Sequence, residues 1–116
     1  MKINELLSRY AAGQRDFRNL NLMAANLRNT NLSGANLSGA NLTKANLTRT
    51  NLTRANLTGA VLSGADLTET NLTQANLTNA NLGDANLSLA NIRGAIIRQI
   101  KLDDGLNDSV ALNNVP

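Results

Sequence analysis

Residues 35–59 read ANLSG ANLTK ANLTR TNLTR ANLTG, which is one five-residue pattern written five times. Extending this frame in both directions gives 18 consecutive pentapeptides over residues 15–104. The central residue is Leu in 15 of them, the residue two before it is Ala in 12, and the residue directly before it is Asn in 13. Because this pattern covers most of the 116 residues, it has to decide the fold.

A period of five fits neither regular secondary structure. On an α-helix, successive central leucines would lie about 140° apart and would wander around the axis. On a straight strand, an odd period would place them on alternate faces. All of them point to one interior only if the chain turns once in every pentapeptide. We therefore expect a coil with Leu inside on every side, and Leu47 and Leu57 to be fully buried.

The number of pentapeptides in one coil is indicated by the three Thr residues that replace the inner Ala. These are Thr30, Thr50 and Thr70, which are spaced by twenty residues. Four pentapeptides per coil would stack them in one column, with neighbouring coils about 4.8 Å apart, as hydrogen-bonded strands are. The alternative is that Thr falls at these three positions by chance. The spacing favours a four-sided solenoid.

The A-N/D-L-S/T-x pattern of residues 15–104 resembles that of the pentapeptide repeat proteins. The resemblance implies an all-β solenoid, a right-handed quadrilateral β-helix of about 4.5 coils, whose central residue and small residue two before it point inward. The other three residues would point outward. The pattern weakens at several positions, as is common in the end coils of solenoids. The inner Ala is replaced by Arg15, Leu20 and Ile100, and the Asn by Val61, Ile96 and Lys101.

Residues 1–14 lack the pattern and predict a short amphipathic helix. Asn4 is suited to cap its N-terminus and Gly13 to stop it. Leu6, Leu7 and Tyr10 fall on one helical face, which we expect to lie over Phe17 as an N-terminal cap. Such a cap would cover leucines and backbone groups that an open end exposes.

The remaining parts of the chain give weaker signals. Residues 105–116 lose the pattern, and we expect a C-terminal tail or a weak cap there, for which Val110, Leu112 and Val115 are the apolar residues available to fold back. The stretch Glu5–Phe17 is similar to the opening of many cyanobacterial pentapeptide repeat proteins, so the resemblance implies a cyanobacterial type of sequence.

The composition argues against an enzyme. The chain has neither Cys nor His, which removes thiolate metal sites and the usual general base. The close carboxylate pairs are Asp66 with Glu69 and Asp103 with Asp104, and we expect both on an outward surface with no cleft. No catalytic, cofactor or metal site is therefore expected. No apolar run is long enough to span a membrane, and no signal-peptide pattern opens the chain, so we expect a cytoplasmic protein.

Basic residues gather in the first half of the repeats. Residues 15–54 carry a net charge of +5, and residues 55–92 carry −3. Lys44, Arg49 and Arg54 hold the last position of three consecutive pentapeptides and should form a partial collar, with Arg28 one coil below. These four residues are the candidate surface for contact with an acidic partner. The alternative is an ordinary solvated surface with some pairing between coils. The four-sided register separately predicts an exposed ion pair between Arg49 and Glu69, which lie twenty residues apart.

We therefore expect a non-enzymatic protein-interaction or scaffold module that presents a rigid charged rod to another protein. It should be a monomer, with an end-to-end dimer as the alternative, and should have no membrane partner. A second hypothesis, implied by the quinolone-resistance members of the family, is DNA mimicry against a type II topoisomerase. The net charge of +3 and the central Leu depart from that group. A third is weak, salt-dependent binding of nucleic acid by the basic half.

Overall fold

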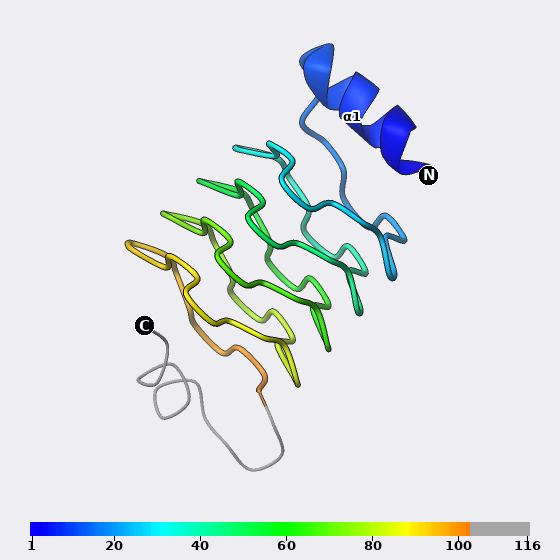
Figure 1. The fold of residues 1–116 in the computed structure, drawn as a ribbon. Helices are drawn as coiled ribbons and strands as arrows, with labels where there is room; N and C mark the ends of the chain where they lie inside the picture. Colours follow the sequence, from blue (N-terminus) through cyan, green and yellow to red (C-terminus); the bar gives the residue numbers. More distant parts are fainter. Residues whose placement is uncertain (103–116) are drawn as a thin grey trace.

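Residues 16–101 form a stack of coils in which each residue position recurs on the coil above. The computed structural model describes residues 1–102, and Figure 1 shows the coils lying parallel to one another with helix α1 (Ile3–Ala11) at the N-terminal end. Parallel bridges join residues twenty apart, from Asp16 with Asn36 to Asn81 with Lys101. Four pentapeptides therefore make one coil, which confirms the register that the Thr spacing predicted.

The sides of the coil are too short to be strands. Within residues 1–102, each side contributes a single bridging residue, the one that precedes the central Leu, and no strand is formed. The turn in each pentapeptide uses the central residue, the two that follow it and the next inner residue. Little extended backbone is left between turns, so the sheet contacts are isolated bridges.

The backbone hydrogen bonds of one pentapeptide account for nearly all of its polar groups. The N–H of Leu42 donates to the O of Val61, and the N–H of Lys44 donates to the O of Ser63, both on the next coil. The N–H of Ala45 closes the turn on the O of Leu42. Asn46 donates back to the O of Ala25 on the previous coil. Because these bonds recur on each side, the coils hold one another in register.

The last residue of each pentapeptide adopts the left-handed conformation. All seventeen such positions from 19 to 99 have a positive φ, and twelve of them are not glycine. Lys44, Arg49 and Arg54 have φ values of 59°, 55° and 59°. This residue is the third of the four residues in the turn. The left-handed conformation costs a side chain other than Gly or Asn about 1–2 kcal/mol. The repeated coil-to-coil bonds offset that cost.

The Asn before the central Leu has a role that the sequence did not reveal. Its Oδ1 accepts a hydrogen bond from the backbone N–H two residues later, as Asn46 does from Thr48 at 3.0 Å. All fifteen Asn and Asp residues at this position make the same bond, whereas Val61 has no acceptor to offer. This Asx turn satisfies the one N–H that the backbone ladder leaves over.

Replacing Val61 with Asn should stabilise the rod by about 0.5–1.5 kcal/mol, because the new amide oxygen would accept the N–H of Ser63. The matched control is Asn51→Val, which removes an existing bond to Thr53 and should destabilise the rod by a similar amount. Urea unfolding of both variants and the parent gives the two differences. Equal stability of the parent and Asn51→Val would contradict the proposed role of the Asn.

The interior is a column of leucines flanked by small residues. Leu47 and Leu57 are both 0% exposed, as expected, and belong to one buried cluster that runs from Leu6 to Leu102. The Thr column is also confirmed. The hydroxyl of Thr50 donates to the O of Leu27, and that of Thr70 to the O of Leu47, each on the coil below. These buried hydroxyls are thus hydrogen-bonded and tie consecutive coils together.

Helix α1 begins two residues earlier than the sequence suggested. Its N-cap is Lys2, which makes no side-chain capping bond, so the prediction of Asn4 as the N-cap is wrong. Asn4 lies inside the first turn, where its backbone is already helical. The C-terminus follows the prediction, because Gly13 has a φ of 99° and its N–H donates to the O of Tyr10. The N–H of Gln14 donates to the O of Arg9, which completes a Schellman motif.

The helix contacts the first coil through one apolar face. Leu6 is fully buried in the same cluster as Phe17, and Leu7 packs against that cluster. The hydroxyl of Tyr10 donates to the O of Ser33 at 2.6 Å. The guanidinium of Arg15 lies 3.7 Å from the centre of the Tyr10 ring, a cation–π contact that helps to hold the ring in place.

Candidate interaction surface

Lys44, Arg49 and Arg54 occupy three successive corners of one coil. Each is the left-handed residue of its turn, and each side chain is exposed. The corner position holds the Cα in a fixed place, since the backbone on both sides is bonded to neighbouring coils. Arg28 is exposed on the coil below and follows Leu27, which lies below Leu47 by the twenty-residue register. The structure therefore places the four residues on two adjacent coils.

Two of the four cations are oriented by amide side chains. The Nε of Arg49 donates to the Oδ1 of Asn29 at 3.3 Å, one coil below, and the Nε of Arg54 donates to the Oε1 of Gln74 at 3.1 Å, one coil above. The Nη atoms of both groups have no partner among residues 1–102. They present donors suited to carboxylate oxygens.

The predicted ion pair between Arg49 and Glu69 is wrong. Within residues 1–102 the ion pairs join Arg9 to Glu5 and Arg18 to Asp16. Arg49 turns down to Asn29 instead of up to Glu69. An exposed pair gains little in water, so a well-placed amide competes with it easily. The guanidinium of Arg49 is consequently not neutralised by a carboxylate of the described chain.

Two acidic side chains of the repeats, Asp66 and Asp16, are engaged in local bonds. The hydroxyl and the backbone N–H of Thr68 both donate to Asp66, and these bonds hold the pKa of that carboxyl below its usual value. Asp16 is paired with Arg18, which lowers the pKa of its carboxyl in the same way. Both carboxylates therefore serve the turn that follows them.

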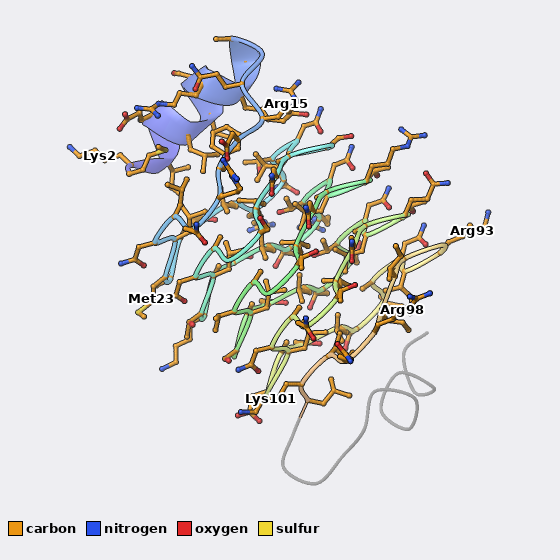
Figure 2. All side chains as sticks on the ribbon, turned by 180° about the vertical axis from the view of Figure 1, so that it is seen from behind. Lys2, Arg15, Met23, Arg93, Arg98 and Lys101 are labelled. Atoms are coloured by element: carbon orange, nitrogen blue, oxygen red, sulfur yellow. The ribbon has the colours of Figure 1, made fainter. Side chains whose placement is uncertain are left out.

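A second group of cations lies at the far end of the stack. Arg93, Arg98 and Lys101 are exposed on the last described coil, and Figure 2 shows them at the end opposite α1. The charge along the rod is thus basic, then acidic, then basic again. The charge count over residues 15–92 did not include this third band, although its three residues are visible in the sequence.

The described residues offer few groups from which a metal site, a membrane span or a base-stacking site could be built. No group of three or more His, Cys, Asp or Glu residues that could hold a metal ion occurs in residues 1–102. No helix there is long and apolar enough to cross a membrane. Of the two aromatic residues, Phe17 is buried and Tyr10 is occupied by Ser33 and Arg15. Neither is available for stacking on a base.

The repeats match those of a known protein family. A family model described as pentapeptide repeats, in 8 copies, matches residues 21–59, 55–94 and 70–104. The chain belongs to the pentapeptide repeat family. This pentapeptide repeat protein is accordingly a right-handed quadrilateral β-helix, as the resemblance implied.

Solved structures of other pentapeptide repeat proteins are similar to this one. A protein of the cyanobacterium Cyanothece 51142 is 27% identical, with a TM-score of 0.72 over 88% of this chain and 96% of that one. A protein of the Arabidopsis thaliana thylakoid lumen is 35% identical, with a TM-score of 0.75 over 87% of this chain and 72% of that one.

A third structure, of a plasmid-mediated fluoroquinolone resistance protein, is 26% identical with a TM-score of 0.44 over 77% of this chain and 56% of that one. No curated protein matches this chain.

Proposed function

We propose that this pentapeptide repeat protein is a non-enzymatic interaction module whose basic collar, defined as Arg28, Lys44, Arg49 and Arg54, binds an acidic segment of another protein. The observation that carries the proposal is that these four cations are exposed on two adjacent coils, and none is paired with a carboxylate of residues 1–102. Their attachment to a hydrogen-bonded scaffold keeps them in place before binding, which lowers the entropy lost on association.

The proposal divides the chain into three parts. Residues 1–14 act as the N-terminal capping helix, residues 15–104 form the 18-repeat β-helix of about 4.5 coils, and residues 105–116 are a C-terminal tail or weak cap. Residues 103–116 lie outside the described part of the chain. Burial of Leu6 and the bond from Tyr10 to Ser33 support the capping role of α1. We expect a monomer, and a cytoplasmic location stays a prediction.

Carboxylates are favoured over nucleic acid as the ligand of the collar. The arginines present side-chain donors, but no exposed aromatic residue among residues 1–102 offers a stacking platform. DNA mimicry against a topoisomerase receives less support, because the chain carries 11 Lys and Arg against 8 Asp and Glu, a net of +3. A mimic of duplex DNA needs an acidic surface, and a gyrase supercoiling assay would report such an activity directly.

Reversing three charges of the collar should abolish most of the binding. We expect the triple variant Lys44→Glu, Arg49→Glu and Arg54→Glu to bind a fluorescent 20-residue polyglutamate probe at least about tenfold more weakly than the parent, because attraction becomes repulsion. Fluorescence anisotropy measures the affinity, and the parent's binding should weaken as salt is added.

The matched control changes three charges in the same way at the other end of the rod. The variant Arg93→Glu, Arg98→Glu and Lys101→Glu has the same net charge as the collar variant. It should keep most of the affinity if the collar is the binding surface. Equal losses in the two variants would show that only net charge matters and would remove the collar from the proposal. A pull-down from the source cells with the parent, the collar variant and the control variant would identify the natural partner as a protein that the collar variant alone fails to bind.

A further inference from the structure

The basic collar borders two sides of the rod. The Asn46 side joins the corners at Lys44 and Arg49, and the Asn51 side joins the corners at Arg49 and Arg54. By the twenty-residue register, the Asn46 side consists of residues 25–29, 45–49, 65–69 and 85–89, and the Asn51 side of residues 30–34, 50–54, 70–74 and 90–94. Each side has a cation at both corners, so the corners alone do not decide where an acidic segment binds.

The Asn51 side carries an unbroken column of amide side chains. Parallel bridges join Asn51 to Asn31 on the coil below and to Asn71 on the coil above. Neighbouring members of the column are therefore about 4.8 Å apart, as residues on hydrogen-bonded strands are. On the Asn46 side the same column is interrupted, because the residue that bridges Asn46 from above is Asp66.

The amides of the Asn51 side turn their oxygens inward and their NH2 groups outward. The Oδ1 atoms of Asn31, Asn51 and Asn71 accept the backbone N–H two residues later, at 3.1, 3.0 and 3.0 Å. Their Nδ2 atoms donate to no residue among 1–102. No buried side-chain nitrogen or oxygen of those residues lacks a partner, so these NH2 groups face the solvent. The side thus presents a column of N–H donors.

Carboxylates distinguish the two sides further. The residues of the Asn51 side include no Asp or Glu. On the Asn46 side, Asp66 lies one coil above Asn46, and its bonds from Thr68 hold the pKa of its carboxyl below the usual value, so it is charged at neutral pH. An acidic segment over Asn46 would meet this like charge about 4.8 Å away. Glu69 lies at the corner that both sides share and does not distinguish them.

The two arginines of the Asn51 side lean in opposite directions along the rod. The Nε of Arg49 donates to Asn29 on the coil below, and the Nε of Arg54 donates to Gln74 on the coil above. The two guanidinium groups therefore lie at different heights on the two edges of this side. A line between them runs obliquely across the coil that contains Asn51.

We infer that the acidic segment lies obliquely across the Asn51 side, where its carboxylates accept hydrogen bonds from Arg49, Arg54 and the Nδ2 of Asn51. The inference rests on the proposed function of the collar and adds to it the side, the path and the amide donors. Charge-assisted bonds to the arginines supply most of the attraction, and the amides favour carboxylates that lie between them. Lys44 and Arg28 add attraction at longer range.

The same substitution on the two sides tests the inference. Asn51→Asp and Asn46→Asp change equivalent positions of one coil, each between two corner cations. Asp at this position keeps the turn, because Asp66 accepts the N–H of Thr68 as the Asn residues accept theirs. Asn51→Asp should weaken binding of the polyglutamate probe by at least about tenfold, and Asn46→Asp by less than about threefold. Fluorescence anisotropy measures both affinities.

Nuclear magnetic resonance of the parent protein gives a second readout without a change of charge. The side-chain NH2 signals of Asn51 should shift when unlabelled polyglutamate is added, whereas those of Asn46 should stay in place. The two Asp variants assign these signals, since each variant lacks one pair.

Three results would overturn the inference. Equal losses of affinity in the two Asp variants, or a larger loss in Asn46→Asp, would show that the segment does not choose the Asn51 side. Shifts at Asn46 in the absence of shifts at Asn51 would place it on the other side. In both cases the proposed function survives if the triple collar variant still loses binding. A parent protein that does not bind the probe would overturn the proposed function and this inference together.

Discussion

Replacing Leu47 with Asp should leave the protein unfolded at room temperature. Leu47 is 0% exposed in the middle of the stack, and its carbonyl accepts bonds from the N–H of Thr50 and the hydroxyl of Thr70. The substitution loses about 1.5–3 kcal/mol of burial and adds the larger cost of an unpaired buried carboxylate. Because native domains are stable by only about 5–15 kcal/mol, the sum is decisive for a rod of this size.

The measurement is far-ultraviolet circular dichroism with thermal unfolding. The control is Arg49→Asp, which introduces the same side chain two residues later at an exposed corner. That variant should fold, since Asp tolerates the left-handed conformation. A Leu47→Asp protein with the parent's spectrum and unfolding curve would show that this position does not face the interior.

Removing residues 1–14 should promote self-association of the protein. The truncation uncovers Phe17 and the interior of the first coil, and it removes Leu6 and the bond from Tyr10 to Ser33. Losing Leu6 alone costs about 1.5–3 kcal/mol of burial. The exposed coil then offers unpaired backbone groups and apolar side chains to a second molecule.

Sedimentation velocity at several concentrations measures the change. Leu6→Asp in the full chain should produce a similar effect, whereas Ser8→Asp, on the exposed face of the same helix, should not. A truncated protein that stays as monomeric as the parent would show that α1 is not a cap.

The arrangement of the coil was predictable because one physical requirement determines it. A period of five with Leu at the centre demands a turn in each repeat, and the spacing of Thr30, Thr50 and Thr70 fixes the number of sides. The hydroxyls of Thr50 and Thr70 then explain the column, since each reaches a leucine carbonyl one coil below. Burial and register therefore follow from the pattern alone.

The surface was less predictable because small energies decide it. The role of the Asn before the central Leu was not predicted, because the left-handed residue is the last of the repeat, as at Arg49. The Asn instead supplies its side-chain oxygen to the turn, as Asn46 does. Whether Arg49 bonds to Glu69 or to Asn29 depends on differences below about 1 kcal/mol, which residue types alone do not resolve.

The fixed twenty-residue register gives every surface residue an angular phase. A residue's direction around the axis depends on its number modulo twenty, and its height depends on how many whole turns precede it. Inserting twenty residues would lengthen the rod and leave every direction unchanged. Inserting five would rotate everything beyond it by a quarter turn, so that the collar residues and the C-terminal cations would face new relative directions with the core intact. A protein of this kind can therefore change its surface pattern by gaining or losing a repeat, while the buried residues it already has keep their inward positions.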